Sequence, residues 1–128
     1  MYKPKLEQDL RCPMEYAVSA FSGKWKARII CLLDLKGILR YKEIKAATAG
    51  ITDNMLAASL KELISAELVE RRQYQEIPPR VEYTLTEKGK SLVPLLHRIC
   101  GWAVSTYGEE IRPDHHGCPY LEEDREEP

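Results

Sequence analysis

The segment that most constrains the fold is residues 71–89, RRQYQEIPPRVEYTLTEKG, because it has the pattern of a β-hairpin inside a mainly helical sequence. Residues 81–85 (VEYTL) alternate apolar and polar side chains, which predicts a half-buried strand, and residues 68–74 can pair with it. The tip, residues 77–80 (IPPR), holds two prolines, so we expect a stiff loop rather than a two-residue turn. The sequence therefore predicts one hairpin with an arginine at its tip.

Helical periodicity predicts two helices in the first part of the chain, within residues 12–36. The first covers residues 12–22 (CPMEYAVSAFS), with Cys12 at the N-cap and Pro13 at the first helical position, where proline is favoured. The second covers residues 24–36, in which apolar side chains at helical spacing predict one buried stripe. Residues 38–40 are expected to form a very short strand.

Residues 41–65 have the pattern of a helix-turn-helix. Residues 41–48 predict a short helix with Ile44 and Ala47 facing inward, Gly50 lies in a tight turn, and Thr52 offers the N-cap oxygen of a second helix. The apolar stripe of that second helix consists of Leu56, Leu60, Leu63 and Ile64. Many ordinary helical hairpins share this pattern, so it gains weight only from the hairpin that follows it.

A long helix is predicted after the hairpin. Thr86 caps it, it begins near Glu87, and Pro94 is expected to bend it or mark a break. Its predicted apolar face consists of Leu92, Leu95, Leu96, Ile99, Trp102 and Ala103.

This order of elements predicts an α+β, mainly α fold: a winged helix-turn-helix with a two- or three-stranded wing sheet and additional N- and C-terminal dimerisation helices. The domain should span residues 12–107, between a mobile arm (1–11) and a polar acidic tail (108–128). In a winged helix the second helix of the pair enters the major groove, and the wing reaches the backbone or minor groove beside it. The predicted DNA contacts are therefore Thr52, Asp53, Asn54, Ala57, Ala58, Lys61, Arg71 and Arg80.

Two of these residues, Arg80 and Asp53, leave alternatives open. Arg80 suits phosphate or a narrow groove, but it could instead pair only with Glu76 or Glu82. Asn54 can read adenine through two hydrogen bonds. Asp53 would repel phosphate unless it accepts from a cytosine amino group or caps its own helix.

The charge distribution favours a polyanion as partner. The net charge is −1, but residues 114–128 carry −5, so the first 113 residues carry +4. A mildly basic body with an acidic end fits a DNA-binding domain, although a neutral surface with a disordered tail gives the same sums. The sequence shows no signal peptide, and its longest apolar run, IICLL, is too short to span a bilayer. A cytoplasmic protein without membrane contact is expected.

Three stretches resemble the HxlR family of bacterial winged-helix transcription regulators: GKWKARIICLL (23–33), GITDNMLAASLKEL (50–63) and PPRVEYTLTEKGKSL (78–92). The resemblance runs from about Cys12 to Tyr107. It implies a cytoplasmic repressor or activator that binds a pseudo-palindromic operator as a homodimer, with the first and last helices at the interface. Family members often carry Gln, Lys, Thr and Gln on the recognition face, which this chain lacks, so the operator cannot be taken from relatives.

The last helix itself supports a dimer, because it is apolar on two sides and one small domain cannot cover both. Alternatively, the first and last helices complete a single monomer core. The predicted interface residues are Tyr16, Phe21, Val93, Ile99, Cys100, Trp102 and Val104.

Cys12 is the candidate redox-sensing residue. At an N-cap its thiolate would face unpaired backbone amides, with Arg11 favourable and Glu15 unfavourable. Some HxlR members sense oxidants or electrophiles through an N-terminal cysteine, and Cys12 lies where that residue is expected. The alternative is a capping cysteine without a signalling role.

No other chemistry is predicted. The segment DHHGCP holds His115, His116 and Cys118, but a surface tail is favoured over a metal site. There is no nucleotide-binding loop, H-E-x-x-H or G-x-S-x-G motif, so we expect no enzyme, metal or cofactor. No small-molecule effector is identified. The alternative function is a winged-helix module for protein–protein contacts, which salt-dependent DNA binding would distinguish.

Overall fold

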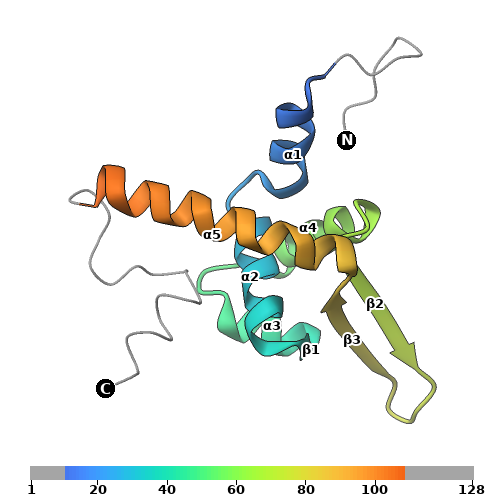
Figure 1. Ribbon diagram of the computed structural model, residues 1–128. Coiled ribbons are helices and arrows are strands. Elements are labelled where there is room, and N and C mark those ends of the chain that lie inside the picture. Colours follow the sequence, from blue (N-terminus) through green and yellow to red (C-terminus); the bar gives the residue numbers. More distant parts are fainter. Residues whose placement is uncertain (1–10, 109–128) are drawn as a thin grey trace.

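The computed structural model describes residues 11–108 (Figure 1). Almost all of the predicted arm and acidic tail, including His115, His116 and Cys118, lies outside these residues. The described elements follow the predicted order: α1 (Pro13–Phe21), α2 (Lys26–Lys36), β1 (Ile38–Leu39), α3 (Tyr41–Ala47), α4 (Asp53–Ser65), β2 (Val69–Tyr74), β3 (Arg80–Leu85) and α5 (Glu87–Tyr107).

The strands form one antiparallel sheet in the order β1-β3-β2, so the wing sheet has three strands rather than two. The hairpin ladder runs from Val69↔Leu85 to Tyr74↔Arg80, whereas β1 pairs only with Thr84 and Tyr83 at the base of β3. Tyr83 and Leu85 are buried and Val81 is half-buried, which confirms the predicted alternation. The outer half of the hairpin is thus a two-stranded ribbon that projects from the helical body (Figure 1).

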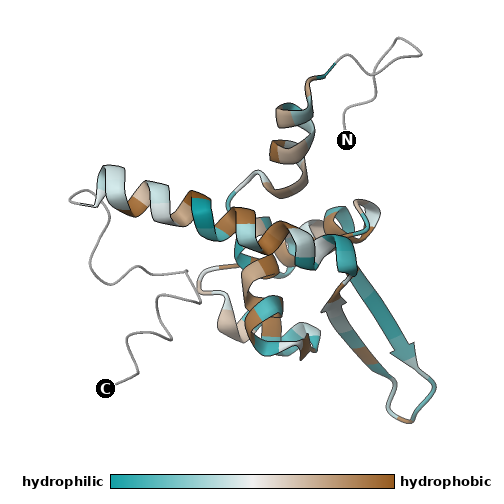
Figure 2. Cartoon of the chain, in the orientation of Figure 1, coloured by the Kyte–Doolittle hydropathy of each residue, from teal (hydrophilic) through white to brown (hydrophobic). Residues whose placement is uncertain are grey.

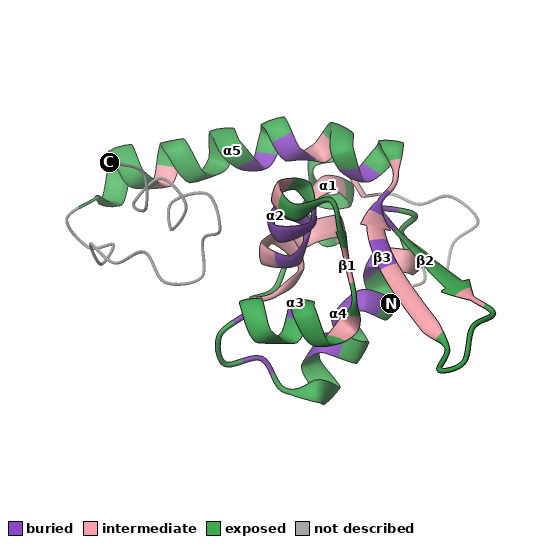
Figure 3. Cartoon of the chain, turned by 90° about the horizontal axis from the view of Figure 1, so that it is seen from below, coloured by how far each residue is buried: buried purple, intermediate pink, exposed green. Residues whose placement is uncertain are grey.

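The core is centred on α2, whose residues 29–33 are all buried (Figure 3). The sequence predicted a single stripe, but Ile30 is covered as well, because α3, α4, α5 and the sheet surround this helix. Burying each large apolar side chain contributes roughly 1.5–3 kcal/mol, so these consecutive positions make a substantial contribution to the stability of the fold.

The helix-turn-helix forms as predicted except at one position. Ile44 is fully buried, but Ala47, expected to face inward, is exposed. The helix ends at Ala47, and the next residue turns into the core: Thr48 is buried, and its hydroxyl donates to the Ile44 carbonyl oxygen at 2.8 Å. Gly50 has φ +85°, which fits the predicted glycine turn, and Thr52 caps α4 by accepting from the Met55 amide.

Helix α5 begins as predicted, with the Thr86 hydroxyl accepting from the Gly89 amide. It then runs as a single helix through Pro94, so of the two expectations, a bend or a break, the break does not occur. Pro94 is exposed, and the carbonyl group that its missing N–H would have bonded can face water.

The core beneath α5 is shorter than the helix itself. Val93 and Leu96 are buried, whereas Leu95, predicted on the core face, is 43% exposed. At about 1.5 Å per residue, α5 is nearly twice as long as α2, so its C-terminal half extends beyond the helix that it packs against (Figure 1).

One junction ties α4, the hairpin and α5 together at Leu68. Helix α4 closes with Glu67 at φ +63° and with the Leu68 amide donating to the Leu63 carbonyl oxygen at 3.0 Å, a Schellman arrangement. The Leu68 carbonyl oxygen in turn accepts from the Thr86 amide at 3.1 Å. A Cβ atom on Gly89 would lie only 2.2 Å from that same oxygen, so the first turn of α5 and the α4–β2 turn fit together only with glycine there.

We predict that Gly89→Ala destabilises the protein by about 1–3 kcal/mol, the usual cost of overpacking, because the added methyl group meets main chain that cannot rotate away. The change is read from chemical denaturation midpoints. Gly101→Ala is the matched control in the same helix, where a Cβ meets no atom within 4 Å; it should stabilise by about 0.5–1 kcal/mol. Equal effects of the two substitutions would contradict the close approach at Leu68.

Candidate nucleic-acid interface

The exposed side of α4 presents the predicted DNA-contacting residues together. Leu56, Leu60 and Leu63 are buried, so the opposite side of the helix faces outward (Figure 3). All six predicted positions of this helix and its cap are exposed: Thr52, Asp53, Asn54, Ala57, Ala58 and Lys61. Within residues 11–108, neither Asn54 nor Lys61 forms a side-chain hydrogen bond or ion pair, so both are available to a ligand. The Thr52 hydroxyl is already engaged as the helix cap.

The negative charge of Asp53 is paired with the positive charge of Lys45, a partner that the sequence analysis did not predict. Its carboxylate lies 3.0 Å from the Lys45 ammonium group, and its carbonyl oxygen accepts a hydrogen bond from the Tyr41 hydroxyl at 3.0 Å. Burial, followed by the Asp53 carboxylate, raises the pKa of Tyr41, so this hydroxyl stays protonated as a donor. The two contacts join both ends of α3, Tyr41 in its first turn and Lys45 in its last, to the start of α4.

Three further residues belong to this surface but were not predicted. Arg40 and Lys42 are exposed where α3 begins, and neither forms an ion pair in the part of the chain that the structure describes. Met55 is exposed beside Thr52 and could contact the apolar edge of a base. A count of cations around residues 40–45 would have indicated the first two; nothing in the sequence distinguishes Met55 from a core residue.

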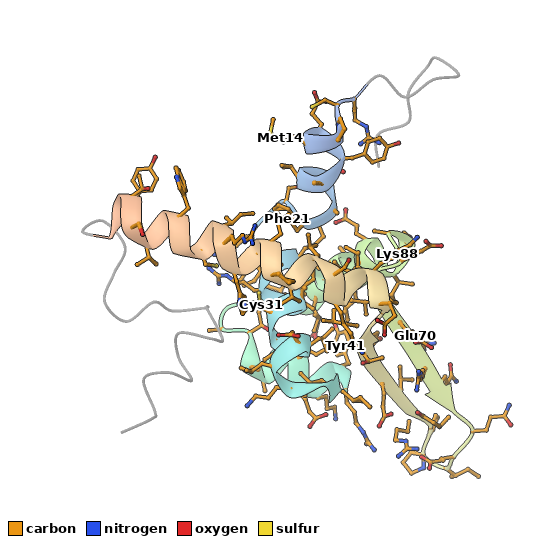
Figure 4. The ribbon with its side chains drawn as sticks, viewed as in Figure 1. Met14, Phe21, Cys31, Tyr41, Glu70 and Lys88 are labelled. Atoms are coloured by element: carbon orange, nitrogen blue, oxygen red, sulfur yellow. The ribbon has the colours of Figure 1, made fainter. Side chains whose placement is uncertain are left out.

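The wing arginines are held by carboxylates or amides of the hairpin. On β2, Arg71 donates to the Gln73 side-chain oxygen at 3.3 Å, and Arg72 donates to the Glu70 carboxylate at 3.1 Å. The Glu70 contact raises the pKa of Arg72. Figure 4 shows Glu70 at the base of the hairpin, near Lys88.

Arg80 is not at the apex of the wing, contrary to the expectation. It is the first residue of β3, its guanidinium carbon lies 4.1 Å from the centre of the Tyr74 ring, and its side chain is only 32% exposed. Its Nε lies 3.2 Å from Glu76 and 3.9 Å from Glu82, without the alignment of a hydrogen bond to either. The pairing that the sequence left as an alternative is therefore present in the unbound protein.

A second exposed surface is apolar and follows α1 and the overhanging half of α5 (Figure 2). Of the predicted interface residues, Tyr16, Ile99, Cys100, Trp102 and Val104 are exposed there, and Trp102 packs edge-on against Tyr107 at 5.6 Å. Val93 is a correction, because it is 6% exposed within the core of one chain. Phe21 is half-buried against that core, and Figure 4 shows it on the side of α1 nearest α5. Exposed residues that were not predicted for the interface are Met14, Val18 and Leu95.

Helix α1 is tied to the body by Lys26 as well as by Phe21. The Lys26 ammonium group donates to the Ser19 carbonyl oxygen of α1 at 3.0 Å and lies 3.4 Å from the Glu62 carboxylate of α4.

Cys12 occupies the N-cap of α1 as predicted, but its sulfur does not cap the helix. The thiol instead donates to the Glu15 carboxylate at 3.6 Å, while the Arg11 guanidinium group lies 4.0 Å over the Tyr16 ring. Glu15, the unfavourable neighbour, thus contacts the Cys12 sulfur directly, whereas the guanidinium group of Arg11, the favourable neighbour, stacks on Tyr16. Cys12 and Cys100 are exposed, Cys31 is buried, and none of these three is in a disulfide.

No metal site and no membrane segment is found in the described part of the chain. Residues 11–108 contain no group of three or more His, Cys, Asp or Glu side chains placed to hold a metal ion. Among the helices of this region, none is both long and apolar enough to cross a membrane.

Comparison with known proteins identifies relatives of this arrangement. The family model described as HxlR-like helix-turn-helix matches residues 20–111. An HTH-type transcriptional regulator of Methanothermobacter thermautotrophicus is 46% identical over 96 residues, which cover 75% of this chain and 72% of the relative. The reduced form of the transcriptional regulator YodB from B. subtilis is 42% identical, with TM-score 0.67, over 74% of this chain and 93% of that chain. The redox regulator HypR in its oxidised form is 35% identical, with TM-score 0.67, over 73% of this chain and 96% of that chain.

We predict that Asp53→Asn strengthens binding to a random-sequence DNA duplex about two- to fivefold, the equivalent of one exposed ion pair, because it releases Lys45 for phosphate. The plot of log affinity against log salt should become steeper by about one ion. Fluorescence anisotropy of a labelled duplex measures both quantities.

The control is Glu62→Gln, which makes the same change in net charge. At about 100° per residue, Glu62 lies half a turn from Asp53 on α4, and it pairs with Lys26 rather than with a cation of the exposed face. An equal gain from both substitutions would mean that only net charge matters and that Lys45 makes no phosphate contact.

Proposed function

Because the chain belongs to the HxlR-like helix-turn-helix family of DNA-binding transcriptional regulators, we propose that it binds a pseudo-palindromic operator as a homodimer and responds to oxidants or electrophiles through Cys12. The observation that carries the proposal is the exposed side of α4, where Asn54 and Lys61 lie beside small alanines and a projecting wing. Regulation in the cytoplasm, without enzymatic activity, is the proposed role.

Each subunit places α4 in the major groove. Ala57 and Ala58 let the helix backbone approach the base edges closely, so that Asn54 can bind adenine through two hydrogen bonds and the alanine methyl groups can meet a thymine methyl. Lys45, Lys61 and the two exposed cations at the start of α3, Arg40 and Lys42, bind phosphates on either side of that groove. Arg71 and Arg80 extend these contacts along the wing.

Two subunits associate through the apolar surface of α1 and α5. Large apolar side chains exposed along one helix are rare on a monomer, and burial against a second copy removes them from water. Two-fold symmetry then makes each α4 read one half-site, with half-sites about 34–36 Å apart. The side chains available for this interface are Met14, Tyr16, Val18, Leu95, Ile99, Trp102, Val104 and Tyr107.

The operator hypothesis is tested by selecting bound duplexes from a random DNA pool. The wild-type protein should recover two inverted half-sites spaced by about one helical turn. Asn54→Ala should lose preference at one base pair in each half-site, costing about 1–3 kcal/mol against the original base, because Asn54 carries the only amide side chain on α4 and an amide can bind adenine through two hydrogen bonds.

Lys61→Ala is the comparison variant, since loss of a phosphate contact should weaken all sequences alike and leave the preferred site unchanged. Recovery of a lone half-site would argue against the homodimer. An Asn54→Ala variant that selects the wild-type sequence would remove Asn54 from base recognition, and a wild-type protein that enriches nothing would leave protein–protein contact as the function of the wing.

The proposed sensor step starts from an exposed thiol at the edge of the α1 surface. The Cys12 sulfur attacks hydrogen peroxide, becomes a sulfenic acid, and the peroxide is reduced to water. The added polar group lies on the helix proposed for the subunit interface, so it shifts how two α1–α5 surfaces meet and with them the spacing of the α4 helices. Similarity to HypR, a redox regulator, supports this role.

We predict that peroxide changes the DNA affinity of the wild-type protein and that Cys12→Ser retains basal binding but loses the response. Cys100→Ser, which removes another exposed thiol, should respond like wild type. Glu15→Gln should speed the alkylation of Cys12 by iodoacetamide, because the carboxylate that repels the attacking thiolate is gone. Labelling rates by mass spectrometry and gel shifts before and after oxidant measure these effects; an unchanged response in Cys12→Ser would reduce Cys12 to a helix-capping position.

A further inference from the structure

Three of the five residues in the loop at the end of the wing, 75–79, are apolar, and the other two, Gln75 and Glu76, are exposed and polar. Between β2 and β3, Ile77 is 102% exposed, so its side chain loses no surface to the rest of the protein, and Pro78 and Pro79 beside it are exposed too. The two prolines carry no N–H group, so this turn offers few hydrogen-bond donors to a polar partner. Figure 2 shows the apolar colour at the turn of a hairpin that is otherwise polar on its outer side.

Arg80, the cation expected at the tip of the wing, lies at the start of β3, behind this turn. Arg80 rests on the Tyr74 ring and beside Glu76, and it is paired across the ladder from Tyr74 rather than placed in the loop. A ligand that meets the wing end-on therefore contacts Ile77 and the prolines first, and the guanidinium group reaches it from the side.

We propose that Ile77 is a specificity-determining residue that enters the minor groove beside the half-site and contacts the groove floor. This inference rests on the proposed operator binding. Apolar Ile and Pro side chains are those that proteins insert into minor grooves, where the stiff prolines limit the entropy lost on binding. Arginine at the flank of the same hairpin supplies attraction to the groove walls and the phosphates.

The groove floor decides which sequence accepts such a side chain. At A·T pairs it presents only acceptors, whereas at G·C pairs the guanine 2-amino group projects from it. An apolar tip cannot accept a hydrogen bond from that amino group and would keep water from it. Ile77 therefore favours A·T pairs at the wing positions, by exclusion rather than by hydrogen bonding.

The test uses the duplex recovered from the random pool, with 2,6-diaminopurine in place of adenine only at the wing positions. This base adds an amino group to the minor groove and leaves the major-groove edge of adenine unchanged. Wild-type affinity should fall about tenfold, within the usual cost of one wrong base pair. Ile77→Ala should bind the unmodified duplex more weakly and lose most of this discrimination, with the salt dependence unchanged because no charge is removed.

Arg80→Ala is the matched variant on the same hairpin. It should keep the discrimination against diaminopurine and lower the salt slope by about one ion. Since the Ile77 side chain makes no packing contact, the thermal midpoint of Ile77→Ala should equal that of wild type, which excludes a folding defect.

Two outcomes overturn the inference: wild-type binding that is indifferent to diaminopurine, or an Ile77→Ala variant that still discriminates as wild type does. Both leave operator binding intact, since the unmodified duplex is still bound. A wild-type protein that binds no duplex in the selection overturns the proposed function itself, so the two failures are distinguishable.

Discussion

The main chain of Leu68 joins α4 and the hairpin, the two elements of the proposed DNA-binding surface. Its amide closes the Schellman turn of α4, its carbonyl oxygen binds the first turn of α5, and the absence of a side chain at Gly89 allows the close fit. The hairpin leaves from this point, so the direction of the wing relative to α4 is set by main-chain hydrogen bonds. Such bonds do not depend on the surface side chains, so a substitution on the proposed DNA-binding surface leaves this geometry in place.

Several cations of the proposed DNA-binding surface are paired with carboxylates in the unbound protein, although Arg40, Lys42 and Lys61 have no such pairing within residues 11–108. Lys45 pairs with Asp53, Arg72 with Glu70, and Arg80 lies beside Glu76. Exposed pairs of this kind contribute roughly 0–1 kcal/mol each, so a phosphate can replace the carboxylate at little cost. The pairs also keep the cations extended and ordered, which lowers the entropy lost when a polyanion binds.

Most of the fold followed from the sequence, because its determinants are local. The caps at Thr52 and Thr86, the glycine turn at Gly50 and the alternation along β3 each depend on a few neighbouring residues, and each was found as predicted. The errors depend on tertiary geometry. Val93 was assigned to an interface because periodicity does not reveal how far the core extends beneath α5, and Ala47 was placed inward because the helix was taken to continue one residue further. The position of Arg80 likewise depends on where the β2–β3 ladder ends. The Cys12 thiol donates to the Glu15 carboxylate instead of capping the backbone of its helix.

The contacts of Lys26 give α1 an influence beyond its own surface. One ammonium group, at the start of α2, binds a carbonyl oxygen of α1 and lies beside a carboxylate of α4. If α1 rotates as a rigid body, the Lys26 side chain either follows it and leaves Glu62, or stays beside Glu62 and loses the Ser19 carbonyl oxygen. Either change alters the contacts between α1 and α4. Linkage is reciprocal, so in the proposed complex a shift of α4 on DNA would act on α1 through the Lys26 ammonium group. Lys26 is thus, together with the packing of Phe21, one of the contacts through which α1 is connected to the rest of the protein.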